Sequence, residues 1–284
     1  MVSFNSGLIG KDDMIVSEFS DDFYAKEGCL TWTEDISILK RLMAKQCSLA
    51  IITDIKVNDD IENKNIIFCS NPLRLFEKIV DKCFSWPKTE LIIGNNSIVH
   101  DNVSIGKNVC IGDNCRIGPN VVIGDNVTIG CNVEIGSFST IGNSPYYILL
   151  DKNNRTRNRK IYGCTIIRDN VHIGSYCSVD NGITTETVIG IGCRIGNYVE
   201  IGHDVKMGNN CCICAQTAIG GFVTIGNDCV FWGRSGVSNR ITIASRTTLL
   251  ASSILTKSVF KDGQILCGFP AVPRIEHWKK VIQK

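Results

Sequence analysis

The chain has 284 residues, of which 44% are hydrophobic and 20% charged, and its formal net charge is +2 at pH 7. This size allows one large domain or two smaller ones. The near-neutral charge and the dispersed Lys and Arg do not indicate binding to nucleic acid, and the densest basic run, Lys152–Lys160, is typical of a solvated loop. The first residues lack the features of a signal peptide, and no apolar run approaches the roughly 20 residues of a membrane helix. We therefore expect a cytoplasmic protein without a membrane span.

Residues 1–88 predict a small α/β domain. Asp35–Gln46 has the pattern of an amphipathic helix, and Ser48–Thr53 and Asn65–Cys69 are typical of buried strands. Asn71–Cys83 begins with a capping residue followed by Pro at the first helical position, which predicts a second helix.

After a predicted linker at Ser85–Glu90, an aliphatic residue recurs every six residues. The repeat runs from Ile93 to Ile141, resumes at Ile167 for three repeats and, after a four-residue offset, continues from Ile189, which gives 24 repeats in all. A period of six fits a short strand followed by a turn. Three such faces would close a triangular coil of 18 residues, so that like residues stack in columns.

The repeat predicts a mainly β protein. Residues 89–268 should form a parallel β-helix of about eight coils, roughly 38 Å long at the usual strand spacing. We attribute the corner backbone to the Gly or Asn that follows each aliphatic residue. Residues 269–284 should leave the β-helix and form a short C-terminal helix.

The fifteen cysteines do not predict a metal site or a disulfide framework. Four of them precede a repeat aliphatic by two residues, where a small side chain should face inward: Cys115, Cys193, Cys211 and Cys229. The one tight cluster, Cys211–Cys214, lacks a second pair at zinc-ligand spacing. We interpret the cysteines as structural, reduced thiols.

One histidine stands at a corner of the predicted β-helix. His203 follows Ile201 by two positions, so its side chain should project outward, and Gly221 and Asn239 should occupy the same corner of the next two coils. An imidazole beside a flexible glycine amide offers the base and the oxyanion donor that acyl transfer needs. The alternative interpretation is a surface histidine on a turn.

The hexads of about residues 90–268 resemble the left-handed parallel β-helix of the hexapeptide acyltransferases. From Val179 onward the chain is similar to the UDP-3-O-acylglucosamine N-acyltransferases of lipid A synthesis. The motifs that carry this resemblance are Asp180–Gly182 with Thr187–Gly190, Gly196–Gly208, Ala218–Gly226 and Gly268–Lys280. The resemblance implies a left-handed β-helix and a homotrimer.

The resemblance also implies roles for individual residues. His203 would be the general base, the Gly221 amide the oxyanion donor, and Asn197 an active-site partner. The implied substrate-binding residues are Trp32, Asp35, Asp180, Asn181, Asn239 and Arg240, and those for the acyl thioester are Phe231, Trp232 and Gly268. Trp32 as a core residue, and Trp232 as a residue packed against a neighbouring subunit, are the alternatives.

Several positions depart from the family pattern. Where the family has Phe, Asn and Tyr around the uridine, this chain has Trp32, Asp35 and Ile38, and Arg240 replaces a second histidine. The C-terminal tail, associated with docking of acyl-carrier protein, is short, and Trp232 stands where small residues are usual. The positions that correspond to the family's nucleotide site and to its acyl-donor site therefore both differ in this chain.

We expect an N-acyltransferase without a permanently bound cofactor. It would transfer an acyl group from acyl-CoA or acyl-carrier protein to the amine of a nucleotide-linked amino sugar, for lipopolysaccharide or another surface glycan. The short tail and Trp232 favour a short acyl-CoA donor.

Three alternatives stay open. One is the lipid A enzyme itself, with a 3-hydroxyacyl carrier-protein donor. A second is a zinc lyase of the γ-carbonic anhydrase type, which the spacing of His172 and His203 disfavours because it puts them on different corners. The third is a non-catalytic structural β-helix.

Overall fold

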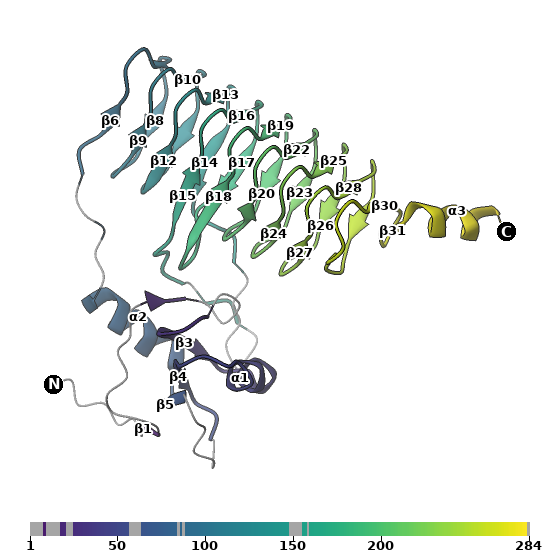
Figure 1. The fold of residues 1–284 in the computed structure, drawn as a ribbon. Helices are drawn as coiled ribbons and strands as arrows, with labels where there is room; N and C mark the ends of the chain where they lie inside the picture. Colours follow the sequence, from purple (N-terminus) through teal and green to yellow (C-terminus); the bar gives the residue numbers. More distant parts are fainter. Residues whose placement is uncertain are drawn as a thin grey trace. The chain divides into compact units, whose positions relative to one another are not determined.

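The computed structural model divides the chain into two compact units, residues 1–85 and 86–284, whereas the predicted boundary lies between residues 88 and 89 (Figure 1). The residues that the structure describes are 8–9, 18–20, 25–56, 64–83, 86, 89–147, 155–157 and 159–282. Part of the predicted linker and part of the basic run at Lys152–Lys160 lie outside them.

The first unit is built on one five-stranded sheet in which the three longer strands run parallel. Two of these longer strands were predicted, and the third, β3, was not. The order across the sheet is β1 (Leu8–Ile9), β5 (Lys64–Phe68), β4 (Leu49–Thr53), β3 (Cys29–Thr33) and β2 (Glu18–Phe19).

Both predicted helices of this unit are confirmed, as α1 (Ile36–Met43) and α2 (Pro72–Cys83). Asp35 caps α1, because its carboxylate accepts the N–H groups of Ser37 and Ile38 at 2.7 and 3.3 Å. Asn71 caps α2 in the same way, through the N–H of Arg74 at 3.2 Å.

Helix α1 ends before the predicted Gln46. The ammonium of the buried Lys64 donates to the backbone carbonyls of Lys45 and Cys47 at 2.8 and 2.6 Å. Because a buried ammonium needs such acceptors, the chain turns here and presents its carbonyls to Lys64.

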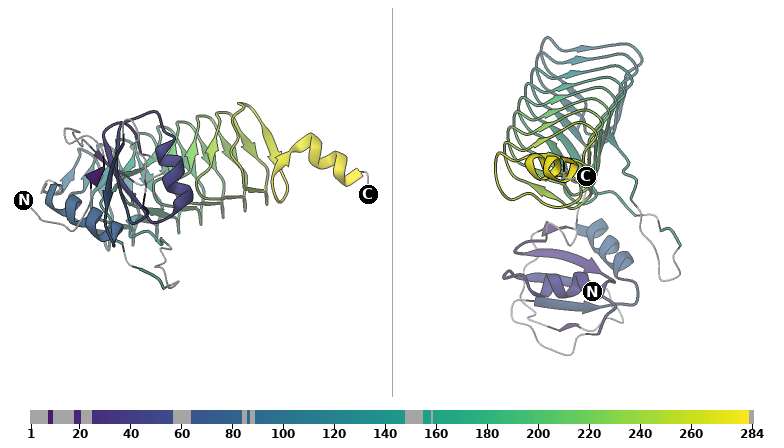
Figure 2. Two further views of the ribbon diagram at one scale, coloured as in Figure 1. Left: turned by 90° about the horizontal axis from the view of Figure 1, so that it is seen from below. Right: turned by 90° about the vertical axis from the view of Figure 1, so that its right-hand side faces the viewer.

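The second unit is a parallel β-helix of three sheets, which confirms the predicted fold class; its left hand stays a prediction (Figures 1 and 2). Sheet I holds β7 (Ile98–Val99), β10 (Arg116–Ile117), β13 (Glu134–Ile135), β16 (His172–Ile173), β19 (Arg194–Ile195), β22 (Cys212–Ile213), β25 (Val230–Phe231), β28 (Thr248–Leu249), β30 (Ile265–Cys267) and the antiparallel β31 (Val272–Pro273).

The other two sheets have eight strands each, and the chain visits sheets III, I and II in turn. Sheet II holds β8 (Ser104–Ile105), β11 (Val122–Ile123), β14 (Thr140–Asn143), β17 (Ser178–Asp180), β20 (Glu200–Ile201), β23 (Ala218–Ile219), β26 (Gly236–Val237) and β29 (Ile254–Leu255). Sheet III holds β6 (Ile92–Ile93), β9 (Cys110–Ile111), β12 (Val127–Ile129), β15 (Cys164–Ile167), β18 (Glu186–Ile189), β21 (Lys206–Met207), β24 (Thr224–Ile225) and β27 (Thr242–Ile243).

Away from the insert, the four-residue offset and the C-terminal end, each corner of the β-helix is made by two residues, and the second has a left-handed backbone. Asn takes this second position most often, for example Asn114 at φ 57° and Asn210 at φ 56°, as predicted. The glycine before the corner has another cause. A Cβ on Gly112 would lie 2.7 Å from the backbone of Gly130 in the next coil, so glycine is needed there for close approach.

The four cysteines predicted to face inward are buried, which confirms their placement. Their thiols also make hydrogen bonds, which the apolar interpretation did not include. The Sγ atoms of Cys115 and Cys193 donate to the carbonyls of Gly130 and Gly208, at 3.0 and 3.1 Å, so each thiol ties its coil to the next.

Two irregularities interrupt the coils, and both fall on the corner that joins sheet II to sheet III. Ile129 pairs with Ile167 across the insert at residues 142–163, and Ile167 pairs with Ile189 across the four-residue offset. After the last coil, β31 leads into α3 (Arg274–Ile282), which confirms a C-terminal helix and extends beyond the coils in Figure 2.

Candidate active site

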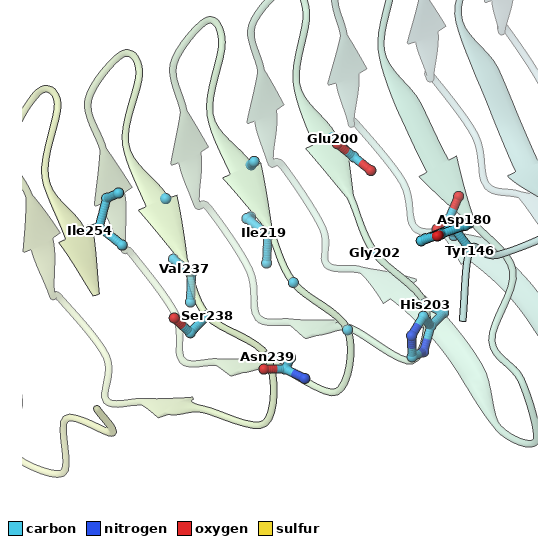
Figure 3. A pocket seen from close by; sticks show the side chains of 14 residues that line it. Tyr146, Asp180, Glu200, Gly202, His203, Ile219, Val237, Ser238, Asn239 and Ile254 are labelled. Carbon is cyan, nitrogen blue, oxygen red and sulfur yellow. The ribbon is translucent and has the colours of Figure 1, made fainter. Parts of the chain in front are cut away.

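A groove of about 440 Å³ runs along the edge of sheet II and crosses several successive coils (Figure 3). His203 and Tyr146 lie near one end with Asp180 and Glu200, and Ile254 lies at the other end. Small residues form the middle of its floor. The groove therefore joins an end rich in titratable groups to a part lined mainly by small and aliphatic residues.

His203 is the first corner residue after β20, as predicted, but its side chain is not exposed. Only 8% of the residue is accessible, because the rings of Tyr147 and Phe222 pack edge-on against the imidazole at 5.4 and 4.9 Å between centroids. The expectation of an outward, exposed imidazole is therefore wrong, because two neighbouring aromatic rings cover it. His203 nevertheless lines the groove.

Asp204, the next residue, holds the imidazole. Its Oδ2 lies 3.0 Å from Nδ1 of His203, and its carboxylate also accepts the N–H of Ile183 at 2.9 Å and the hydroxyl of Thr185 at 2.8 Å. Because an ionised carboxylate only accepts, this contact assigns the proton to Nδ1 and leaves Nε2 as a base. Burial opposes ionisation, but these hydrogen bonds outweigh it and lower the pKa of Asp204.

Asp204 was not among the residues predicted for the site. It occupies the second corner position at φ 56°, where Asn or Asp is common for backbone reasons alone. A signal was present in the sequence. The four-residue offset before β18 supplies Ile183 and Thr185, the donors that a buried carboxylate requires.

Gly221 lies one coil beyond His203, directly against its ring. A Cβ built on Gly221 would lie 2.5 Å from Nε2, so no larger residue fits beside this imidazole. Across the described residues, the N–H of Gly221 has no acceptor. At several other corners the equivalent N–H is engaged: those of Asn95 and Asn209 donate to the Asp113 and Asn227 side chains at 2.6 and 2.8 Å. The Gly221 N–H is therefore available to a ligand.

Two carboxylates line the groove beside His203. Burial raises the pKa of Asp180 to about 6; the charge of His203 lowers it and that of Glu200 raises it. Asn181, predicted with Asp180 to bind substrate, is buried instead. Its side-chain amide donates to the Asp125 carbonyl at 3.1 Å and accepts from Thr165 at 2.7 Å, so its hydrogen bonds are internal.

Asn239 and Arg240 follow Gly221 at the same corner of the next coil. Asn239 lines the groove, as expected from its register. The guanidinium of Arg240 lies 4.6 Å from the centre of the Phe222 ring, which is the ring that packs on His203. Arg240 therefore adjoins the site through Phe222.

Other predicted residues lie away from His203. Asn197 belongs to the corner between sheets I and II, where its Oδ1 accepts the N–H of Ser175 at 2.9 Å. Trp232 stands on that same corner and is 49% exposed. Gly268 has φ 97° and donates its N–H to Ser253 near α3. The roles assigned to these three residues stay predictions.

The expectation that Phe231 binds the acyl thioester is wrong. Phe231 is completely buried and pairs with Ile213 and Leu249 in the column of inward side chains. It cannot contact an acyl chain, because it takes the place of the repeat aliphatic itself.

In the first unit, Trp32 lies on β3 and is half-buried, and Asp35 caps α1. The nucleotide-binding roles implied for both residues stay predictions.

His172 lies on β16 of sheet I, whereas His203 lies on the corner after β20 of sheet II, so the two histidines are on different parts of the coil. In the described part of the chain, no cluster of three or more His, Cys, Asp or Glu side chains is arranged to hold a metal ion. The described helices also include none long and apolar enough to cross a membrane.

The family of the bacterial transferase hexapeptide (six repeats) matches residues 91–125 and 186–221, about a quarter of the chain. Fold and repeats together define a hexapeptide-repeat β-helix protein. The chain resembles UDP-3-O-acylglucosamine N-acyltransferase 1 of Sulfurimonas denitrificans, with 35% identity over 136 residues, which are 46% of this chain and 42% of that protein.

A second relative is the probable UDP-3-O-acylglucosamine N-acyltransferase 2, mitochondrial, of Arabidopsis thaliana, with 34% identity over 41% of this chain and 38% of that protein. The matches therefore span less than half the length of these curated relatives. Among solved structures, UDP-N-acetylglucosamine acyltransferase from Campylobacter jejuni is similar with a TM-score of 0.58 and 21% identity, covering 65% of this chain and 69% of that chain. That similarity shows a shared fold.

Proposed function

We propose that the protein is an N-acyltransferase that acts on the amine of a nucleotide-linked amino sugar. The observation that carries this proposal is the arrangement of His203, Asp204 and Gly221 in one groove. It offers a base with an oriented Nε2 and an unengaged backbone N–H on adjacent coils. Acyl transfer to an amine requires these two elements.

In the reaction, the amine nitrogen attacks the carbonyl carbon of an acyl thioester, and Nε2 of His203 takes the proton that the amine gives up. Asp204 stabilises the resulting imidazolium through Nδ1. The Gly221 N–H stabilises the oxyanion of the tetrahedral intermediate. The carbon–sulfur bond then breaks, the thiolate takes the proton from His203, and an amide and a free thiol are released.

The acceptor we favour is UDP-3-O-acylglucosamine, because the names of both curated relatives specify it. This makes the lipid A alternative better supported than transfer for another surface glycan. Asp180 and Glu200 support an amine acceptor, since their carboxylates attract a protonated amine to the end of the groove where His203 lies. Asn239 would contact the sugar from the next coil.

The donor, the assembly and the location belong to the same proposal. We retain a short acyl-CoA as the donor, on the strength of Trp232 and the short C-terminal helix, with acyl-carrier protein as the alternative. A homotrimer and a cytoplasmic location rest on the resemblance and on the sequence. The Arabidopsis relative, by its name, is mitochondrial.

The decisive experiment incubates the purified full chain with a UDP-3-O-acylglucosamine and either acetyl-CoA, 3-hydroxybutyryl-CoA or a long-chain 3-hydroxyacyl carrier protein. Mass spectrometry then detects the amide product. We expect turnover with at least one donor, and a fall of roughly 10²–10⁴-fold in His203→Ala.

His172→Ala is the matched control, because the His172 side chain is 45% accessible, pairs with Glu134 at 3.1 Å and lies outside the groove that holds His203. A folded wild-type protein that forms no amide from any of these donors would contradict the proposed function. Equal losses in both variants would remove His203 from the mechanism.

A further inference from the structure

Two aromatic rings pack on the imidazole of His203, and one of them comes from the insert. Phe222 is the second corner residue of the following coil, with φ 58°, and packs edge-on at an interplanar angle of 85°. Tyr147 belongs to the insert at residues 142–163 and packs at 75°. The coil repeat alone would supply Phe222 but not Tyr147.

Each of these two rings has an arginine over it. The guanidinium of Arg240 lies 4.6 Å from the centre of the Phe222 ring, and that of Arg159 lies 5.6 Å from the centre of the Tyr147 ring. Cation–π contacts of this kind favour a fixed ring position. Arg159 also comes from the insert, so the insert supplies both a ring and the cation that covers it.

The first residues of the insert are anchored on sheet II. The register shifts between Ile141 and Asn143, where Gly142 takes φ 79° and lets the chain leave the coil. The amide of Asn143 donates to the hydroxyls of Thr140 and Ser178 at 2.7 and 2.9 Å. These bonds fix the point from which the chain runs to Tyr147.

The last residues of the insert reach the other partner of His203. The N–H groups of Tyr162 and Gly163 donate to the carbonyl of Ile183, at 2.8 and 3.1 Å, and the N–H of Ile183 donates to Asp204. A Cβ on Gly163 would lie 2.0 Å from the carbonyl oxygen of Thr185, so the insert packs tightly on the loop that holds Asp204. The insert thus contacts the imidazole at one end and the support of its carboxylate at the other.

We propose that Tyr147 is a positioning residue for His203. This inference rests on the proposed function. Tyr147 and Phe222 together prevent rotation of the imidazole, so that Nδ1 keeps its hydrogen bond to Asp204 and Nε2 keeps facing the groove. Rotation by half a turn would exchange Nδ1 with a carbon and break the contact with Asp204. Tyr147 touches the ring of His203 and does not take part in proton transfer.

The test compares Tyr147→Ala, Tyr147→Leu and Tyr147→Phe in the full chain. A misplaced base loses rate rather than affinity, so kcat should fall roughly 10- to 100-fold in Tyr147→Ala while KM for the acceptor changes little. Tyr147→Phe should restore kcat because it keeps the ring. Tyr147→Leu keeps apolar volume without a ring, so it should remain folded and still lose kcat.

A second readout needs no substrate. In the wild type, imidazole ¹⁵N-correlated NMR should show His203 with its proton on Nδ1, protected from exchange by Asp204. This proton should exchange rapidly in Tyr147→Ala and Tyr147→Leu but not in Tyr147→Phe. Phe260→Ala, which removes an 83% exposed ring outside the groove, is the matched control and should leave both readouts unchanged.

The two readouts separate this inference from the proposed function. If the wild type transfers no acyl group, the proposed function fails while the NMR comparison still decides the role of Tyr147. If Tyr147→Leu keeps the protected Nδ1 proton and the wild-type kcat, the inference is overturned. A uniform loss in Tyr147→Phe as well would also overturn it, since the ring would then not be the active element.

Discussion

The two corners that flank sheet II are made by the same repeat but carry different side chains. On the corner between sheets I and II, Phe138, Tyr176 and Tyr198 stack in successive coils, with centroids 5.1 Å apart and interplanar angles of 4–5°. On the corner between sheets II and III, Asp204 is followed by Phe222 at the equivalent position. Like residues stack on themselves, whereas unlike residues leave room for a site.

The difference extends to the backbone. At several corners the side chain of the first corner residue accepts the N–H of the first corner residue in the preceding coil, as Asp125 does for Lys107 at 2.7 Å. At Gly221 this side chain is missing, and the imidazole of His203 occupies the space where a Cβ would lie. The corresponding acceptor for the Gly221 N–H would be the side chain of Asn239, but Asn239 lines the groove, and among the described residues the Gly221 N–H has no acceptor. The site arises where the corner pattern is broken, which is where departures from local consistency are expected.

Among the variants that test this difference between the corners, Asp204→Asn should lose the most turnover. An amide in this position would point an NH₂ group at backbone donors or at Nδ1, so turnover should fall by about 10²–10⁴-fold, as for other orienting carboxylates. Steady-state kinetics measures this. Asp228→Asn is the control, because Asp228 has the same corner backbone, φ 58°, without a histidine beside it.

Asp204→Asn should also change the pH dependence of stability. The folded pKa of Asp204 is lowered, so its ionised form stabilises the protein above the unfolded pKa of about 4, and this contribution is lost as pH falls through the folded pKa. The difference in unfolding free energy between wild type and variant should therefore shrink below about pH 4. A difference that is constant from pH 7 to pH 3 would argue against an ionised Asp204.

Gly221→Ala should have the next largest effect. The new methyl group would lie 2.4–2.9 Å from three ring atoms of His203, so the imidazole must move. We expect kcat to fall by about 10²-fold, with a smaller effect on thermal stability. Gly233→Ala serves as the control on the corner between sheets I and II, since its Cβ would meet only the Ala215 carbonyl oxygen, at 3.3 Å. Equal kcat values in the two variants would show that the corners are not functionally different.

The sequence predicts the regular parts of this molecule well and the irregular parts poorly. The column of inward aliphatics fixes the coils, because a shift of one residue would expose the core. Asp204 was not predicted as a site residue, because an Asp at the second corner position is already explained by the left-handed backbone there. The burial of His203 was not predicted, because Tyr147 packs on the ring from an insert that lies outside the repeat. Phe231 was assigned to the acyl thioester from its distance along the coils after His203, although it stands at a repeat-aliphatic position, which turns its ring into the core.

A smaller effect is expected at Asp180, and its sign depends on pH. Burial raises the pKa of Asp180 to about 6, so the ionised form costs stability above that pH, and the cost is absent near pH 4. Asp180→Asn should therefore raise the unfolding free energy at pH 7.5 by roughly 1–2 kcal/mol, allowing for solvent screening. The gain should vanish toward pH 4 in urea titrations. A variant less stable than wild type at pH 7.5 would contradict the cost assigned to burial.

The smallest effect concerns Tyr176 on the corner between sheets I and II, where aromatic stacking and backbone strain act in opposite directions. Tyr176 stacks on Phe138 and Tyr198, and each such contact contributes about 0.5–1.5 kcal/mol. Tyr176 also has φ 57°, a left-handed backbone that Asn adopts at a lower cost, by about 1 kcal/mol. Tyr176→Ala loses the stacking and keeps the strain, whereas Tyr176→Asn loses the stacking and relieves it. The Asn variant should therefore be more stable than the Ala variant by about 1 kcal/mol in urea unfolding. Turnover should be unchanged in both, because this corner lies away from His203. Equal stability of the two variants would mean that the stack, and not the backbone, decides which residues this corner accepts.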